Sequence, residues 1–95
     1  MAEFRLSNVA KDDLIRIHHY GVENFGIKQA DLYFEAFFVK FELIAKRSFA
    51  FESVDYIKSG YRKCPCGVDT IYYRINDNFV EIMTIVRYQD LKNIK

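Results

Sequence analysis

The side chains with the clearest chemical potential are basic and aromatic residues in the second half of the chain. They fall in three segments that we expect to form neighbouring strands, so alternation along each strand divides them between two faces of one sheet. Together, such side chains can bind the phosphates and bases of nucleic acid, or neutralise the charge that develops in a ribonuclease transition state. Arginine and tyrosine also dominate protein–protein contacts, and charged residues are common on the rim of a solvated sheet. The residues are Arg62, Lys63, Arg74 and Arg87, with Tyr61, Tyr72, Tyr73 and Tyr88.

Cys64 and Cys66 are two residues apart on a predicted strand, so both side chains point to the same face. A metal or redox site would use such a pair, but the spacing is not Cys-x-x-Cys and no second pair of ligands follows. Residues this close along a strand are also poorly placed to form a disulfide with each other. We therefore expect two reduced, structural thiols.

Other catalytic and ligand-binding patterns find little support. His18 and His19 are neighbours on a predicted helix, about 100° apart around its axis, so they cannot face one ligand together. Their spacing matches no zinc motif, and the chain has no glycine-rich loop for a phosphate. Serine, histidine and aspartate are all present, but no motif supports a catalytic triad. We expect no metal and no cofactor.

The overall composition favours a protein partner over nucleic acid. With 14 basic and 13 acidic residues the net charge is +1, whereas a general nucleic-acid binder is normally clearly basic. Of the 95 residues, 51% are hydrophobic and 17% aromatic, yet a single domain of this size hides only about 60–65% of its unfolded surface. Some rings should therefore be exposed as a binding patch, unless the tyrosines simply reach from the core to the surface.

The sequence shows no sign of export or membrane insertion. Residues Met1 to Arg5 carry early charges and no apolar core of a signal peptide. The most apolar stretch is interrupted by Lys40 and Glu42, so no run reaches membrane-spanning length. With two cysteines and no export signal, we expect a reducing cytoplasmic location.

The first half of the chain predicts a short strand followed by two helices. Residues 4–7 alternate as a strand does, and Ser7 or Asn8 can cap a helix from Ala10 to about Asn24. Two aspartates should then lie in the first turn, where the helix dipole favours negative charge. They are Asp12 and Asp13.

A second helix should run from Lys28 to about Arg47, after Gly26 ends the first. Its apolar residues recur every three or four positions and are unusually bulky, and further apolar residues widen the stripe. So wide an apolar arc must contact more than one surface, which we expect to be the first helix and either a sheet or a partner. The stripe consists of Ala30, Phe34, Phe37, Phe41 and Ile44, flanked by Tyr33, Phe38 and Ala45.

The second half predicts three antiparallel strands in one meander. A strand should begin near Gly60 after a connecting loop. The strand at 79–88 should be central in the sheet, because both of its faces are largely apolar. Glycine, asparagine and aspartate mark the turns between the strands. In order, the segments are a loop at 49–59, a strand from Gly60, a turn at 67–69, strands at 70–75 and 79–88 joined by a turn at 76–78, and a charged, frayed tail at 90–95.

A series of short motifs also occurs in a fixed order along nearly the whole chain. The positions are Ala10, Asp13, Leu14 and Ile17, then Phe25-Gly26, Gln29-Ala30, Tyr33 and Ile44-Ala45, then Ile57, Gly60, Tyr61, Arg62 and Lys63, then Pro65, Gly67, Ile71, Tyr73, Arg74 and Gln89-Asp90. Their order and spacing resemble the RelE/ParE superfamily of bacterial toxins, and ParE most closely. The chain departs from the family at Phe25, where Trp is usual, and at Asp69, where many members have His. It also departs at Lys46-Arg47, which replace a usual Asn-Pro.

The resemblance implies a single α+β toxin domain over residues 1–95, with the order β-α-α-β-β-β. It implies a binding inhibitor, not an enzyme, that poisons DNA gyrase by trapping the cleaved-DNA complex, with no sequence-specific DNA binding of its own. It further implies a ParD-like antitoxin whose C-terminal segment wraps the helical hairpin and the sheet. On this reading, candidate antitoxin contacts are Tyr33, Phe34, Phe37 and Phe38, and candidate gyrase contacts are Arg62, Lys63, Arg74, Arg87 and Tyr88.

Two alternatives stay open at this level. A RelE-like, ribosome-dependent messenger-RNA endonuclease would use Arg74, Arg87 and Tyr88 as transition-state and stacking groups. Against it stand the low net charge and the lack of a convincing acid–base pair. The other alternative is a toxin remnant that still binds an antitoxin but has lost its target.

Overall fold

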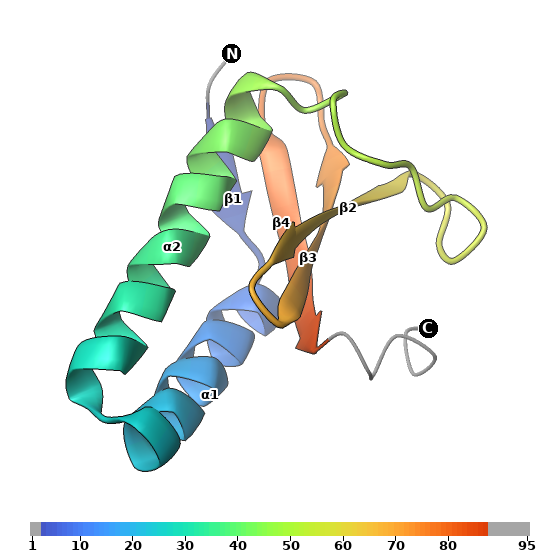
Figure 1. Cartoon of the computed structure of the whole chain (residues 1–95). Coiled ribbons are helices and arrows are strands. Elements are labelled where there is room, and N and C mark those ends of the chain that lie inside the picture. Colours follow the sequence, from blue (N-terminus) through green and yellow to red (C-terminus); the bar gives the residue numbers. More distant parts are fainter. Residues whose placement is uncertain (1–2, 88–95) are drawn as a thin grey trace.

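Two helices pack against one face of a four-stranded sheet (Figure 1). The computed structural model describes residues 3–87. In chain order its elements are β1 (Phe4–Leu6), α1 (Asn8–Phe25), α2 (Ile27–Lys46), β2 (Tyr61–Cys66), β3 (Asp69–Ile75) and β4 (Val80–Arg87). This order confirms the predicted α+β fold and its β-α-α-β-β-β sequence of elements. Tyr88 and the tail at 90–95 lie outside the described residues.

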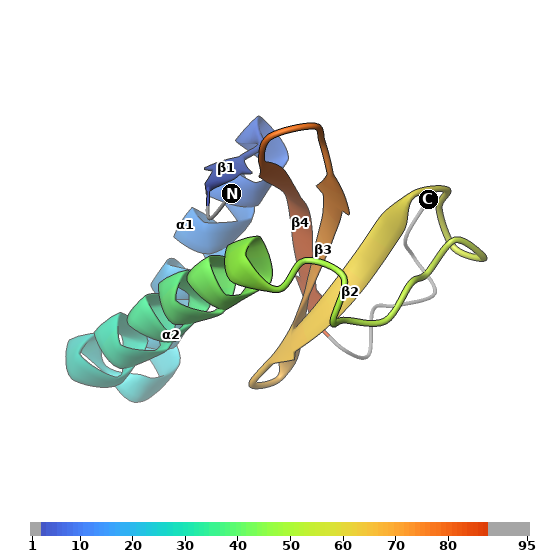
Figure 2. The same cartoon turned by 90° about the horizontal axis from the view of Figure 1, so that it is seen from above.

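The sheet is mixed, with the strand order β1-β4-β3-β2. Strands β2, β3 and β4 form the predicted antiparallel meander, and β4 is central as its two apolar faces indicated. The short β1 pairs parallel to β4, with Phe4 opposite Val80 and Leu6 opposite Ile82. Seen from above, both helices lie on the same side of the sheet (Figure 2).

The start of α1 is fixed by Ser7, which is the capping residue of the two that the sequence allowed. Its hydroxyl accepts a hydrogen bond from the Ala10 amide at 3.0 Å, satisfying a donor that the helix itself cannot pair. Because the helix already begins at Asn8, Asp12 and Asp13 fall after the first turn, so that expectation was wrong.

Asp13 instead ties α1 to an irregularity in β4. Register along β3 shifts between Tyr72 and Tyr73, which pair with Thr84 and Ile82, so Met83 has no partner in the β3 register. The Asp13 carboxylate accepts hydrogen bonds from the Thr84 hydroxyl at 2.7 Å and the Ile85 amide at 2.9 Å. The Ser7 hydroxyl donates to the Met83 carbonyl at 2.7 Å. The helix start therefore satisfies backbone groups at the bulge.

Glycines allow the tight hairpin between the helices. Gly26, with φ 89°, ends α1 and precedes α2 directly, a backbone conformation that other residues rarely adopt. At Gly21 a Cβ atom would lie 3.1 Å from the Cβ of Ala30, so the missing side chain lets the two helices approach closely.

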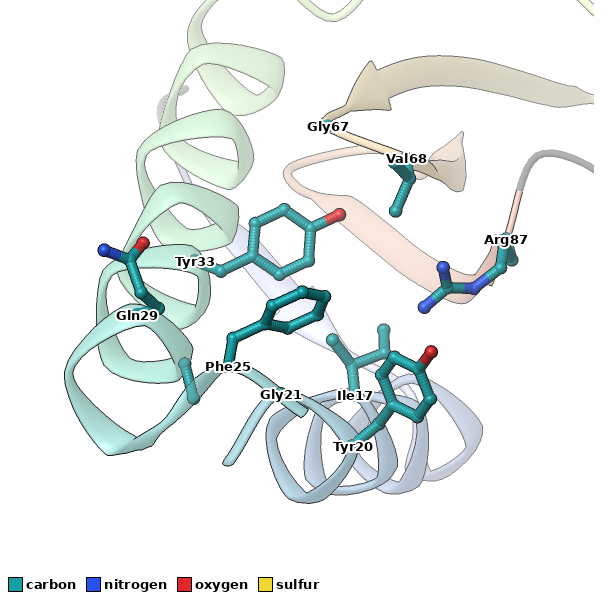
Figure 3. Close-up of a pocket in the computed structure, with 10 residues that line it drawn as sticks. Ile17, Tyr20, Gly21, Phe25, Gln29, Tyr33, Gly67, Val68 and Arg87 are labelled. Carbon is teal, nitrogen blue, oxygen red and sulfur yellow. The ribbon is translucent and has the colours of Figure 1, made fainter. Parts of the chain in front are cut away.

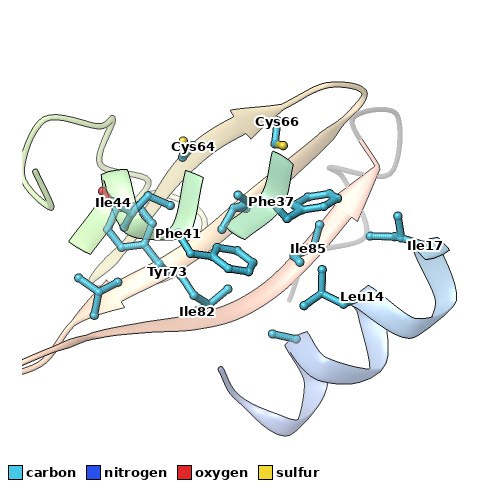
Figure 4. Packing of buried hydrophobic residues seen from close by; sticks show 13 residues of the cluster. Leu14, Ile17, Phe37, Phe41, Ile44, Cys64, Cys66, Tyr73, Ile82 and Ile85 are labelled. Carbon is cyan, nitrogen blue, oxygen red and sulfur yellow. The ribbon is translucent and has the colours of Figure 1, made fainter. Parts of the chain in front are cut away.

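The core lies between α2 and the sheet, closed at one end by α1 (Figure 4). Phe37, Phe41 and Ile44 of α2 have no exposed surface. They pack with Leu14 and Ile17 of α1 and with residues of all three long strands. Those strand residues are Cys64, Cys66, Ile71, Tyr73, Val80, Ile82 and Ile85.

The connection between α2 and β2 extends away from the hairpin, without a helix or a long strand, as predicted (Figure 1). It runs beside β2: the Lys63 amide donates to the Glu52 carbonyl at 3.0 Å, and the Val54 amide donates to the Tyr61 carbonyl at 2.8 Å. These bonds occupy backbone groups on the open edge of β2, where a bare strand would invite pairing with another chain.

Truncation of the core should be far more costly than truncation of the helix surface. We expect Phe37→Ala to lower the free energy of unfolding by roughly 3–5 kcal/mol, because it removes a fully buried ring and leaves a cavity. Val39→Ala, on the same helix but 67% exposed, should change it by no more than about 0.5 kcal/mol. Urea unfolding checks both values, and Phe37→Leu serves if the alanine variant does not fold. Equal losses at the two positions would contradict this packing.

Candidate functional site

A cavity of about 440 Å³ opens between the helical hairpin, the β2–β3 turn and the end of β4 (Figure 3). Its walls are mainly apolar, and among residues 3–87 Arg87 is the one charged residue that lines it. The lining residues are Ile17, Tyr20, Gly21, Phe25, Gln29, Ala30, Tyr33, Gly67, Val68 and Arg87. Preformed apolar concavities of this size are the usual form of a binding site.

The turn that forms one wall is held against α2 by Tyr33. The Tyr33 hydroxyl lies 2.7 Å from Oδ2 of Asp69 and 2.9 Å from the Cys66 carbonyl oxygen, so one hydroxyl faces two acceptors. Asp69 is only 2% exposed, and this hydroxyl supplies a donor to its buried carboxylate. Burial, followed by the bond to Asp69, raises the pKa of Tyr33 well above its ordinary value.

Gly67 is required at this turn for two reasons. Its φ of 60° lies in the left-handed region that favours glycine. A Cβ atom there would also lie 2.6 Å from Cε1 of Tyr33, closer than two carbon atoms can approach. Asp69 occupies the position where many sequences of the resembled family have His. Here its carboxylate has a local hydrogen-bond donor, the Tyr33 hydroxyl.

Arg87 lies at the rim of the cavity, at the end of β4 (Figure 3). Its guanidinium carbon is 5.0 Å from the centroid of the Tyr20 ring, within the range of a cation–π contact. In the sheet it stands opposite Asp69, whose carboxylate is bonded to Tyr33. Within residues 3–87, no carboxylate lies at ion-pair distance from Arg87.

The predicted basic residues divide between the two faces of the sheet, as alternation requires. Lys63 and Arg74 face away from the helices, since they alternate with residues that pack into the core. Lys63 lies 3.8 Å from Glu52, and Arg74 lies 3.1 Å from Glu81.

Arg62 and Arg87 share the helix-facing side but stand at opposite ends of it. The guanidinium of Arg62 donates to the Phe51 carbonyl at 2.7 Å and lies over the Phe49 ring. Because Arg74 and Arg87 are on opposite faces, the sheet does not bring together these two groups of the RelE-like alternative.

The predicted rings of α2 also separate into different roles. Phe37 is fully buried in the core and presents no surface to a partner, which corrects the expectation that it is an antitoxin contact. Tyr33 lines the cavity. Phe34 and Phe38 pack on each other with ring centroids 5.3 Å apart. Both are only partly buried, so each keeps some accessible surface.

Sequence reasoning missed a different surface on α2. Leu32, Val39 and Leu43 are 54%, 67% and 36% exposed, and the partly buried Ala36 lies between them. Spacings of four, three and four residues place these side chains in one line, which we call the α2 stripe. A helical wheel would have found it, because the four residues lie on a flank distinct from the stripe of bulky rings.

The remaining reactive residues have structural surroundings. Both thiols are free and buried toward the helices, and burial raises the pKa of Cys64 and raises that of Cys66 to about 11. Such thiols are poor nucleophiles near neutral pH. His18 contacts Asp31 at 2.8 Å and packs edge-on against Phe34. Across residues 3–87, no three His, Cys, Asp or Glu side chains are grouped to hold a metal ion.

Comparison with known proteins identifies the family. The chain matches the family described as "ParE toxin of type II toxin-antitoxin system, parDE" over residues 4–91. Toxin ParE1 of Caulobacter vibrioides is 31% identical over 86 residues, which cover 90% of this chain and 88% of that protein. A structure of the chromosomal ParDE TA system from P. aeruginosa contains a chain that superposes with a TM-score of 0.81. It is 16% identical, and the match covers 92% of this chain and 96% of the other.

The structural match shows that this α+β fold also occurs in a chain of a ParDE system. The family match and the identity to ParE1 go further: the chain belongs to the ParE toxin family of type II toxin–antitoxin systems. Within residues 3–87, neither helix combines the length and the hydropathy needed to cross a membrane.

The bond between Tyr33 and Asp69 should contribute measurably to stability. We expect Tyr33→Phe to lower the free energy of unfolding by about 1–3 kcal/mol, because it removes a donor from a buried carboxylate. Tyr20→Phe is the matched control, since that residue is 47% exposed and its change should be close to neutral. Urea unfolding of the two variants tests this, and an unchanged Tyr33→Phe protein would contradict it.

The stability of the wild-type chain and that of Tyr33→Phe should also depend differently on pH. Because the pKa of Tyr33 is higher in the folded chain than its unfolded value of about 10, the unfolded chain loses this proton first. Wild-type stability should therefore fall faster than that of Tyr33→Phe above about pH 10.

Proposed function

We propose that this chain is a gyrase-poisoning toxin that traps the cleaved-DNA complex and blocks replication in the cytoplasm. A cognate ParD-like antitoxin neutralises it by wrapping a C-terminal segment around the helical hairpin and the sheet. The observation that carries the proposal is the match to the ParE toxin family over residues 4–91. The name of the relative ParE1 and the ParDE system of the structural match support the assignment of a toxin with an antitoxin partner.

The geometry supports a binding inhibitor over an enzyme. Phosphodiester cleavage needs basic groups and an acid–base pair converging on one reacting phosphate. The basic residues of β2, β3 and β4 that we considered for catalysis instead lie on both faces and at opposite ends of the sheet. Lys63 and Arg74 also pair with carboxylates. A poison that holds another enzyme's intermediate needs only a complementary surface.

The hairpin offers two exposed apolar surfaces for an antitoxin. One is the α2 stripe, and the other is the cavity, around which Phe25 is 67% exposed and Val68 54% exposed. Exposed apolar surface concentrated on one small domain is typical of a protein interface. A segment that folds on binding would cover both by laying apolar anchors into them. Phe34 and Phe38 contribute from the neighbouring flank of α2.

For gyrase, the leading contact among the basic residues is Arg87. The guanidinium of Arg62 is bonded to the backbone, and Lys63 and Arg74 lie beside carboxylates. Arg87 contacts a tyrosine ring at the rim of the cavity, and within residues 3–87 no carboxylate lies at ion-pair distance from it. Tyr88 follows it in the sequence and stays a candidate.

Charge reversal at Arg87 should separate toxicity from folding. We expect Arg87→Glu to remain folded and to lose growth inhibition on induction, since a gyrase contact through this cation becomes repulsive. Lys11→Glu is the control, because Lys11 is an exposed cation on α1, away from the cavity. Colony counts after induction, with circular dichroism of the purified variants, check the outcome. A folded, fully toxic Arg87→Glu protein would remove this residue from the target surface.

The nature of the target is tested in cells. After brief induction, covalent gyrase–DNA adducts should accumulate, while messenger RNA stays intact at the ribosomal A site. Cleavage at the A site without gyrase adducts would support the RelE-like alternative. If a folded, expressed chain produces neither gyrase adducts nor cleavage at the A site, it is a remnant that only binds antitoxin.

A further inference from the structure

The cavity has the features of a site for one anchoring side chain of a protein. Its floor is formed by Ile17 and Ala30, and its rim carries the rings of Tyr20 and Phe25. Among the described residues, its walls are mainly apolar, and the polar groups among them come from Gln29, from the tyrosines and from the Arg87 cation. Tyrosine and arginine around an apolar depression are the residues that most often dominate protein–protein contacts.

The shape of the cavity is fixed before any partner arrives. The turn is held by the bond between Tyr33 and Asp69, and the Tyr33 ring fills the space that a side chain at position 67 would need. On the opposite wall, Gly21 lets the helices approach closely. A preorganised depression binds an apolar side chain without the entropic cost of ordering its walls.

The positive charge of Arg87 favours an acidic residue beside that anchoring side chain. The guanidinium of Arg87 lies over Tyr20 at the rim, and no carboxylate of the described residues pairs with it. Asp69, its neighbour across the sheet, is buried and bonded to Tyr33. An occupant that brings its own carboxylate would gain a charge-assisted hydrogen bond at a partly desolvated cation.

We propose that the cavity receives a bulky apolar side chain of the antitoxin, and that an aspartate or glutamate within one turn of it pairs with Arg87. This inference rests on the proposed function and adds the chemistry of the anchor. It has one consequence for mechanism: the antitoxin occupies the same arginine that we assign to gyrase. Neutralisation would then occur by direct occlusion of Arg87.

The first test uses two small probes and the whole chain labelled with ¹⁵N. 3-Phenylpropionate carries a ring and a carboxylate, and 3-phenylpropanamide is its neutral match. We expect both to shift the amide signals of Gly21, Gly67 and Val68, with the acid binding about three- to tenfold more tightly. Arg87→Gln should abolish that difference, whereas Arg74→Gln, on the other face, should keep it. Equal affinity of acid and amide for wild type, or shifts confined to other surfaces, would overturn the proposal.

The second test uses a phage library of amphipathic helical peptides selected against the immobilised, folded chain. Wild type should enrich a bulky apolar residue followed or preceded within one turn by Asp or Glu. Arg87→Glu should instead enrich Lys or Arg at the acidic position. Peptides without a charge preference, or with the same preference for both proteins, would contradict the role of Arg87. Neither test involves gyrase. A negative result for the cavity and Arg87 therefore does not contradict the gyrase proposal, and a chain without effect on gyrase can still bind the acidic probe and peptides as proposed.

Discussion

The hydrogen bond between Tyr33 and Asp69 is the constraint on which the candidate site depends. It joins the second turn of α2 to the first residue of β3, and it places the β2–β3 turn against the hairpin. Gly67 must then lack a side chain, because the Tyr33 ring fills that space. The same bond occupies the carboxylate that stands across the sheet from Arg87. Within residues 3–87, this buried pair therefore both positions one wall of the cavity and leaves Arg87 without a carboxylate partner.

Much of the fold could be predicted because its signals are local. Bulky residues every three or four positions define α2, glycine ends α1, and Asn76 to Asn78 form a turn between apolar strands. Long-range pairings carried no such signal. A strand of three residues does not reveal its partner, so the parallel pairing of β1 with β4 emerged only from the structure. The role of Asp13 was missed for the same reason, since its acceptor function depends on a bulge 71 residues away.

The candidate site was predicted less well, because side-chain type does not determine burial. The sequence indicates that some rings of α2 belong to the core but does not show which, and the direction in which the helix meets the sheet buries Phe37 completely. That same direction leaves the α2 stripe outside. Alternation correctly divided the basic residues between two faces, but it could not show which of them lie beside carboxylates. Only the tertiary structure sets Arg87 apart.

The account is tested most directly by adding the purified chain to DNA gyrase with ATP and relaxed plasmid, with and without the protein encoded beside it as antitoxin. It predicts loss of supercoiling and accumulation of linear DNA after the gyrase is denatured, both reversed by the antitoxin. Unchanged supercoiling and no cleaved DNA, with a chain shown to be folded, would contradict the claim that this member of the ParE family acts on gyrase.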